Sequence, residues 1–519
     1  MAYSRPGVYI TERLLTAPIA SGASANAAGA VAAPFAQGPE TLTYVTSWYD
    51  FSKYFGGYNA AYPATFGVAQ FFQNGGRELY VKRILHSDAG SASVNVQTSG
   101  AVTVVTVTAK NRGADGTNLR AQVTLGTVTN TYTLSIYKET VAGTGSDITN
   151  DVLLEQYQNI YFDPAYSTTS DYAGTVVNSV SSYVTLSNLA TGTPVVAVYP
   201  LTMSGGVANG GDGTAVVAAD YTSYGSTTAS VWNEFSTVDR PLVLFTPNIY
   251  QYITASTATV TSDAASWADA NQGFYVAETA SGLTVDAAIA VGQALGGKST
   301  TALYFPNLYI SDPVGRGNGS LRLVGPSGAM AGVYLANDAK HGVFKAPAGL
   351  STVVQGVVSL ERAFTSTELD RMNNGLPTAG TGSVAPVNPI RQIPGAGIVV
   401  MGGRTLLQDG TANKYVNMRR SLIYIKARLK ALTQFAIFEN NDELLWSKIN
   451  SSLNSFLNEY RNNGGLRGAT PGQAYFVKCD AQNNTVTSIA NGEVHIQVGV
   501  ALQYPAEFIV IDLSQKTLN

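Results

Sequence analysis

The chain has 519 residues, a formal net charge of −3 and 13% charged side chains, where an average protein has about 25%. This length exceeds what one hydrophobic core supports, so we expect about three domains, and the weak negative charge gives no global signal for nucleic acid or an anionic membrane. Low charge is typical both of a surface covered by further copies of the chain and of a Ser/Thr/Gly-rich β protein, and composition leaves both open.

Cysteine and histidine usage limits the possible chemistry further. Cys479 is the single cysteine, so no internal disulfide can form, and the chain suits a reducing compartment. His86, His341 and His495 lie far apart in the sequence, so we expect no metal site and no cofactor. No Ser/His/Asp or paired-carboxylate constellation stands out, and we expect no enzyme.

Residues 1–25 are predicted to form an N-terminal arm rather than a signal peptide or a membrane span. Proline, glycine and glutamate interrupt any apolar core near the start, and an Ala/Gly/Ser-rich stretch follows. Within the arm, Val8 and Ile10 alternate with Tyr9 and Thr11 as in a strand. No partner strand follows at hairpin distance, so this strand must find its hydrogen bonds elsewhere.

Residues 26–88 are predicted to form an α/β segment. A strand at 41–47 leads into a helix with Ser47 as its N-cap and Gly56 at its end. A second helix and a strand at 78–84 complete the pattern.

Residues 89–200 are predicted to form a mostly β insertion with one helix near 175–184, because β-branched alternating runs are separated by Gly, Asn and Asp turns. Residues 201–395 return to an α/β pattern and are interpreted as a middle domain. The Gly-rich stretch 205–214 near their start offers one carboxylate, Asp212, so we interpret it as a surface loop rather than a calcium site.

Residues 292–299 match the phosphate-loop pattern, with Gly292 followed by Gly297, Lys298 and Ser299. A phosphate loop follows a strand and opens a helix, so that backbone N–H groups face the anion. Here a predicted helix at 284–295 precedes the glycines and a predicted strand follows them. We therefore interpret the glycines as the end of a helix, with the lysine at the negative end of its dipole.

Residues 396–505 are predicted to form a C-terminal domain built on a helical hairpin. The first helix carries a continuous apolar face at i, i+3/i+4 spacing, made by Met418, Leu422, Ile425, Leu429, Leu432 and Ala436. Asn440 and Glu443 resemble a capping box that starts the second helix, which ends near 463–465. Arg419, Lys426 and Lys430 share one flank of the first helix, which the pattern alone makes a solvated flank.

Residues 506–519 are predicted to form a C-terminal strand or arm. The stretch Phe508, Ile509, Val510 and Ile511 is apolar on both faces, and such a terminal strand aggregates unless something covers it. It is either an internal core strand or a strand donated to a neighbouring molecule.

Taken together, these segments resemble contractile tail sheath proteins, above all those of contractile-tailed bacteriophages. Stretches similar to the sheath family occur in the family's order along nearly the whole chain. Together they indicate the family more specifically than any single stretch does. They are residues 4–12, 38–57, 70–84, 111–119, 311–349, 397–406, 414–425, 435–449, 468–480 and 505–513.

The resemblance implies a mixed α/β (α+β) multidomain fold, with an inner domain built from both chain ends, a middle α/β domain and an outer β insertion. It implies a structural subunit that polymerises as stacked six-fold rings around an inner tail tube. The sheath would contract from a metastable extended state to drive the tube through the host envelope and deliver the genome, without nucleotide. Further partners would be baseplate and tail terminator proteins, with no direct nucleic acid contact and no membrane insertion. The implied location is the virion, assembled in the host bacterial cytoplasm.

The resemblance also assigns roles to particular residues. In the family, both arms add strands to sheets of neighbouring subunits, and the matching positions are Val8, Tyr9 and Ile10 at one end and Phe508, Ile509, Val510 and Ile511 at the other. The family's basic inner helix contacts an acidic tube, which makes Arg419, Lys426 and Lys430 tube-contact candidates.

Three other interpretations stay open at this point. The first keeps the class but assigns the sheath to a phage-derived tailocin or a type VI-like injection system. The second is a nucleotide-binding enzyme that uses residues 292–299. The third is a monomeric or surface-layer β-rich binding protein.

Overall fold

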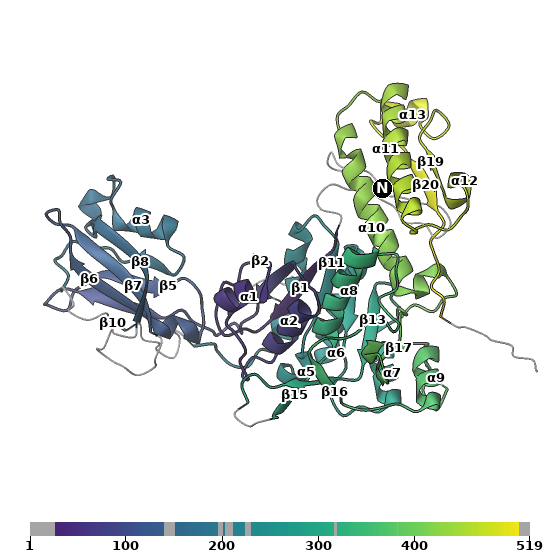
Figure 1. The fold of residues 1–519 in the computed structure, drawn as a ribbon. Coiled ribbons are helices and arrows are strands. Elements are labelled where there is room, and N and C mark those ends of the chain that lie inside the picture. Colours follow the sequence, from purple (N-terminus) through teal and green to yellow (C-terminus); the bar gives the residue numbers. More distant parts are fainter. Residues whose placement is uncertain are drawn as a thin grey trace, which may run out of the picture.

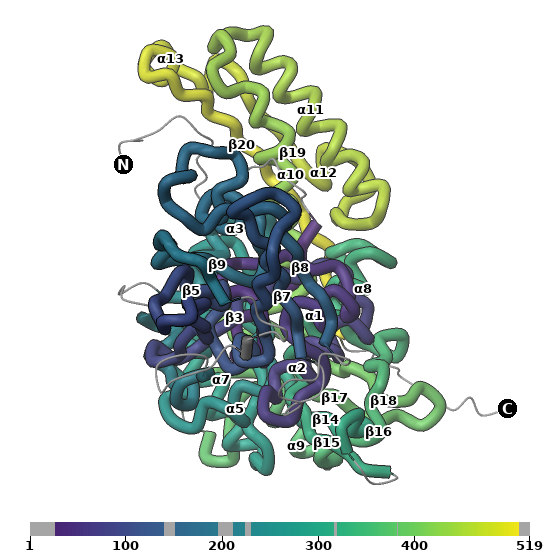
Figure 2. The backbone as a smooth tube through the Cα atoms, turned by 90° about the vertical axis from the view of Figure 1, so that its left-hand side faces the viewer, coloured from purple at the N-terminus to yellow at the C-terminus, as the bar shows by residue number. Residues whose placement is uncertain are grey.

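The computed structural model describes residues 26–139, 151–195, 201–202, 211–223, 230–315, 319–380 and 382–507. Figure 1 shows three bodies in a row: a β-rich insertion, a central α/β body and a helical hairpin with a small sheet. Figure 2, turned by 90°, again places the hairpin beyond one end of the central body. The mixed α/β fold expected from the sequence is confirmed.

The central body is built on an eight-stranded sheet. Six neighbouring strands, from β17 to β3, run parallel, and the two outer strands pair antiparallel to them. In order across the sheet, the strands are β18 (Gly397–Val400), β17 (Val387–Ile393), β13 (Thr301–Phe305), β12 (Phe274–Ala277), β11 (Leu242–Phe245), β1 (Ala28–Ala33), β3 (Leu79–Arg83) and β2 (Thr43–Val45). The chain adds strands on one side of β1 first and on the other side later, so the sheet is doubly wound.

Helices cover both faces of this sheet, which is why its inner strands are apolar throughout. Val31 and Ala33 of β1 face a core shared with α1 (Trp48–Phe55), α2 (Ala64–Gln73) and α8 (Ser327–His341). Ala28, Ala30 and Ala32 face the opposite core, shared with α6 (Thr257–Ala270), α7 (Val285–Leu295) and α9 (Ser366–Asn374). The alternation follows from the two-residue repeat of a strand.

The predicted start and end of the first helix are confirmed. Ser47 Oγ accepts a hydrogen bond from Asp50 N at 3.1 Å, and Gly56 ends α1 with φ +89°. Helices α2 and α8 cross so closely that a Cβ on Gly328 would lie 2.0 Å from Gly67 O. The glycines of both helices therefore permit a contact that no larger residue allows.

The helix-to-strand order around the phosphate-loop match is also confirmed. Helix α7 ends at Gly296, which has φ +73°, and β13 begins at Thr301. Lys298 Nζ donates to Ser266 Oγ at 3.0 Å on the neighbouring helix. The glycines thus lie at a helix C-terminus, where backbone carbonyls rather than N–H groups point outward.

The insertion packs two antiparallel sheets around its own core. One sheet contains β4 (Ser93–Gln97), β5 (Thr103–Ala109) and β9 (Val184–Ser187), and the other contains β10 (Leu201–Thr202), β6 (Leu119–Leu125), β7 (Tyr132–Glu139) and β8 (Asp151–Ile160). Helix α3 (Ala173–Val180) packs on this core through Ala173 and Val177, and it lies where the sequence predicts one helix.

Shorter elements complete the described chain. A three-stranded sheet is formed by β15 (Leu321–Val324), β14 (Leu308–Ser311) and β16 (Val357–Leu360). The short helices and helical turns are η1 (Ala114–Asn118), η2 (Pro164–Tyr166), α4 (Ala219–Thr222), η3 (Val231–Thr237), α5 (Ile249–Tyr252), η4 (Ala412–Lys414), η5 (Gln434–Ala436), α12 (Pro471–Ala474) and α13 (Val486–Ala490).

Candidate assembly site: the C-terminal hairpin and its two-stranded sheet

The C-terminal region forms the helical hairpin that the sequence predicts, from α10 (Val416–Thr433) and α11 (Glu443–Asn462). The predicted apolar face of α10 packs against α11 in a separate core, in which Met418, Ile425 and Leu429 are buried and Leu422, Leu432 and Ala436 are partly buried. This core is distinct from the two cores of the central sheet. The hairpin is therefore a packing unit of its own.

The predicted capping box of α11 is wrong. The N-cap is Asp442, whose Oδ1 accepts a hydrogen bond from Leu445 N at 2.8 Å, and Glu443 is the first helical residue. Three candidate caps stand in a row in this sequence, and Asp442 is the one in extended backbone just before the helix, with φ −134° and ψ 174°. The local pattern offers each of them and does not decide between them.

The basic flank of α10 is mostly withdrawn from solvent. Arg419 and Lys426 are buried, with 6% and 8% of their surface exposed. Lys430 is partly exposed, and its Nζ pairs with Asp239 Oδ1 at 2.6 Å, in the loop that leads into β11. The interpretation as a solvated flank is therefore wrong for Arg419 and Lys426, because periodicity gives the flank but not what packs against it.

A buried ion pair that the sequence analysis missed fixes α10 on the body. Arg420 donates from Nη1 and Nη2 to the two carboxylate oxygens of Asp338 at 2.8 and 2.6 Å, near the end of α8. Its guanidinium also lies 4.7 Å from the ring centre of Tyr334, whose hydroxyl pairs with that of Tyr304 at 2.6 Å. Burial raises the pKa of Tyr334 well above its ordinary value, so this network stays protonated.

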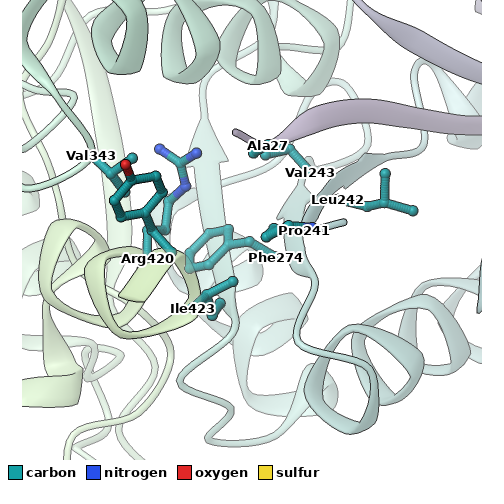
Figure 3. A pocket seen from close by; sticks show the side chains of 9 residues that line it. Ala27, Pro241, Leu242, Val243, Phe274, Val343, Arg420 and Ile423 are labelled. Carbon is teal, nitrogen blue, oxygen red and sulfur yellow. The ribbon is translucent and has the colours of Figure 1, made fainter. Parts of the chain in front are cut away.

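A small, mostly apolar cavity lies between α10 and the amino-terminal ends of β1, β11 and β12 (Figure 3). Its walls come from α10, from β11 and β12, from the segment after α8, and from the start of the described chain. They are Ala27, Pro241, Leu242, Val243, Phe274, Val343, Arg420, Ile423 and Tyr424. Helix α10 is thus held to the body by the ion pairs of Arg420 and Lys430, and the cavity lies beside Arg420.

A two-stranded antiparallel sheet accompanies the hairpin, formed by β19 (Tyr475–Lys478) and β20 (Gln497–Val500). Val498 is buried on the hairpin core, whereas Phe476 is 49% exposed. Within the described ranges, no third strand pairs with either strand of this sheet. Among the described residues, the outer edges of β19 and β20 are thus unpaired, and an unpaired edge is where a further strand can add.

The C-terminal end of the described chain is fixed beside this region. Glu507 accepts two hydrogen bonds from Arg404, at 2.7 and 2.8 Å, and a third from the Tyr415 hydroxyl at 3.1 Å. The strand-donation candidates Val8, Tyr9, Ile10, Phe508, Ile509, Val510 and Ile511 lie outside the described residues.

The part of the chain that the structure describes offers no metal site and no membrane helix. None of its His, Cys, Asp and Glu side chains form a group of three or more that could hold a metal ion. None of the helices drawn from these residues combines the length and the apolar character needed to cross a bilayer.

Comparison with known proteins gives this region an identity. Residues 408–516, which contain α10, α11, β19 and β20, match the family described as the phage tail sheath C-terminal domain. Residues 408–516 are thus similar to a phage tail sheath C-terminal domain. The relationship to contractile tail sheath proteins expected from the sequence is thereby confirmed.

Individual relatives extend the comparison. The tail sheath protein of Vibrio phage KVP40 is 26% identical over 126 residues, which are 24% of this chain and 18% of that protein. The tail sheath protein of Salmonella phage ViI is 24% identical over 128 residues. The matched region therefore spans less than a fifth of the length of these curated relatives.

The likeness of fold reaches well beyond the sheath domain. The contracted helical sheath of the anti-feeding prophage superposes with a TM-score of 0.56, at 20% identity, over 99% of this chain and 100% of that chain. The sheath tail protein of Listeria innocua superposes with a TM-score of 0.56, at 14% identity, over 89% of this chain and 90% of that chain. The central body and the insertion therefore share the fold of sheath proteins together with the sheath domain.

Proposed function

We propose that this chain is the structural subunit of a contractile tail sheath. It polymerises as stacked six-fold rings around an inner tail tube and drives that tube through a host envelope to deliver the genome. The observation that carries the proposal is the combination of a sheath domain at 408–516 with a sheath-like fold over 99% of the chain.

The two-stranded sheet β19–β20 is the proposed acceptor for neighbouring subunits. Strand addition at an open edge supplies main-chain hydrogen bonds, each worth roughly 0.5–1.5 kcal/mol net. The donated strands are Val8–Ile10 and Phe508–Ile511. Support comes from Glu507, which fixes the chain just before the second donor, and from the edges of the acceptor, which pair with no further strand among the described residues.

Tube contact by the basic flank of α10 is the second part of the proposal. Of the three candidates, Lys430 is the best placed, since it is partly exposed and its partner Asp239 is exposed too. Arg419 and Lys426 are buried in the single chain, so they contact a tube only if the subunit uncovers that flank on assembly. Exposed ion pairs contribute about 0–1 kcal/mol each and exchange partners readily, which suits a contact that must break on contraction.

Contraction in this proposal uses no nucleotide and no enzymatic step. The energy comes from extra subunit–subunit burial in the short state, at about 25 cal/mol per Å² of apolar area. The lysine of the phosphate-loop match bonds to Ser266 at a helix C-terminus, which supports this choice over a nucleotide-binding enzyme. Baseplate and tail terminator proteins complete the proposed partners, in a virion assembled in the host cytoplasm.

The likeness to the anti-feeding prophage sheath favours a second candidate, the sheath of a phage-derived injection particle. The sheath subunit would assemble and contract in the same way in a phage tail and in an injection particle. The candidates differ in the cargo of the tube, so examination of native particles for a DNA-filled head separates them.

Negative-stain electron microscopy of the chain, produced with its tube protein, tests the proposal. We expect striated hollow cylinders of one or two widths. Dispersed particles at concentrations where both proteins are soluble and folded would contradict it.

A further inference from the structure

The junction between the insertion and the central body contains a dense polar cluster that assembly by the sheath domain does not explain. The chain crosses this junction twice, leaving after β3 and returning at residues 211–218. Figure 1 shows the insertion standing to one side of the body, next to α1 and β2. Interfaces between domains of one chain commonly permit relative motion, so the contacts at this junction decide whether the insertion can swing.

Arg83, the last residue of β3, lies at the centre of the cluster and is wholly buried. Its guanidinium donates to two carbonyls of the body, Phe35 O at 2.9 Å and Gly38 O at 3.0 Å. It also donates to Arg112 O of the insertion at 2.6 Å. One rigid, planar group therefore joins backbone of both bodies, and a buried charge holds its acceptors firmly because leaving them is costly.

Asp212 adds a third segment to the same cluster. Its carboxylate accepts from Ala114 N of the insertion at 3.0 Å and from the Tyr62 hydroxyl of the body, and it lies 3.5 Å from Arg83 Nη2. Burial and the hydrogen bond to Asp212 raise the pKa of Tyr62, so the hydroxyl stays a donor. Asp212, which the sequence analysis placed in a surface loop, thus ties the returning segment to both bodies.

Gly113 shows how tightly the cluster closes. Its φ is +109°, and a Cβ at this position would lie 2.6 Å from both Arg83 Nη2 and Asp212 Oδ1. Any side chain would therefore push the arginine and the carboxylate away from the insertion, besides straining the backbone. This glycine belongs to the stretch 111–119, one of those that resemble the sheath family.

A second layer of ion pairs surrounds this centre. Arg112 of the insertion pairs with both carboxylate oxygens of Glu40 in the body, at 2.8 and 2.5 Å. Lys138 of the insertion donates to Gln37 of the body at 3.0 Å and pairs with Asp115 at 2.9 Å. Contacts from both crossings and from β7 therefore meet on one side of the body, and no single bond can open without disturbing the others.

We propose that Arg83, Asp212 and residues 111–115 form a rigid joint, so that the insertion is a fixed arm of the central body rather than a hinged domain. The joint goes beyond the sheath proposal, since it acts within one subunit. If the body rotates in an assembly, a fixed insertion rotates through the same angle. A hinged arm would let the insertion keep its place while the body turns.

Distance measurement between two spin labels on the full chain tests the joint. One label is placed at Val180→Cys on exposed α3, and the other at Val358→Cys on exposed β16 of the body. Cys479 is buried, and burial raises the pKa of its thiol to about 11, so it reacts slowly with the label. A chain with Cys479 alone measures the background labelling.

We expect one narrow distance peak for the unaltered joint. Asp212→Asn and Gly113→Ala, made in the labelled chain, should broaden this peak or add a second one. Asp286→Asn is the matched control, since it weakens a comparable pairing with Arg371 and Thr378 inside the body and should leave the peak narrow.

Two results would overturn the joint. One is a broad or two-peaked distribution in the unaltered chain, which would show a hinge. The other is an unchanged narrow peak in both joint variants, which would assign the rigidity to other contacts. If the variants fail to fold, the width of the unaltered peak still decides between a fixed and a hinged arm.

Discussion

The central body covers one edge of its sheet, whereas the two-stranded sheet of the C-terminal domain has no further strand on either side within the described chain. In the body, β18 is covered by residues 349–354, with Gly349 N bonded to Val400 O at 2.8 Å and Val354 N bonded to Ile398 O at 2.9 Å. The C-terminal domain ends with β19 and β20, two strands of four residues each, which pair only with one another in the described chain.

This difference separates a self-contained unit from an incomplete one. A two-stranded sheet is marginal in water unless further strands or a helix complete it. Helix α11 supports one face of β19–β20, and no further strand of the described chain pairs with either edge. Under the proposed function, the body supplies stability, whereas the C-terminal domain supplies the attachment points for assembly.

One substitution made in both regions gives the largest expected contrast. Phe71→Ala removes a fully buried ring that stacks on Phe245 at 5.2 Å, and we expect the unfolding free energy to fall by about 3–5 kcal/mol. Phe476→Ala removes a half-exposed ring on β19 and should change the unfolding free energy by less than about 1 kcal/mol while weakening assembly. Urea unfolding followed by circular dichroism, with pelleting of assembled sheath, checks both. An equal loss of unfolding free energy in the two variants would contradict the proposed difference between the body and the C-terminal domain.

The next largest effect is a pH dependence of the unfolding free energy, caused by a buried carboxyl group in the body. Burial raises the pKa of Glu278 from 4.5 to about 7, although Ser327 Oγ and Ile249 N donate to its carboxylate at 2.6 and 3.1 Å. The folded chain then keeps a proton that the unfolded chain releases. The unfolding free energy should therefore fall as pH rises from 4.5 towards 7, by at most about 1.4 kcal/mol per pH unit from this group.

Glu278→Gln isolates that contribution, since the amide does not titrate. The difference in unfolding free energy between wild type and variant should change steadily between about pH 5 and 7 and level off outside this range. A difference that is constant with pH would show that the carboxylate is ionised throughout, held by its donors at the starts of α5 and α8.

Lys430→Glu gives the smallest effect on folding. It removes one partly exposed ion pair with Asp239, worth less than about 1 kcal/mol, so the unfolding curve should hardly move. Co-sedimentation with tube protein should weaken, and Lys448→Glu on α11 is a matched control for the change of charge. Equal co-sedimentation of wild type and Lys430→Glu would remove this residue as a tube contact.

Much of the local structure could be predicted from the sequence. Ser47 and Gly56 bound α1 because capping depends on neighbours in the chain, and the apolar spacing of α10 predicts its packing face. The reversed order around Gly296 followed from the pattern of the flanking elements in the same way.

Contacts between distant segments could not be predicted. The same spacing that places Arg419 and Lys426 on one flank does not predict that they are buried. Asp212 stands alone in a glycine-rich stretch, and its partners Tyr62 and Ala114 are about 100–150 residues away in the chain, so no local pattern identifies the joint.

Deletion of residues 1–20 tests the central claim that each chain completes the open sheet of its neighbours. The truncated chain keeps all of the described body, so its circular dichroism and its urea midpoint should match those of the full chain. Negative-stain images should then show no cylinders with the truncated chain, alone or with tube protein. Normal cylinders from the truncated chain would contradict the claim.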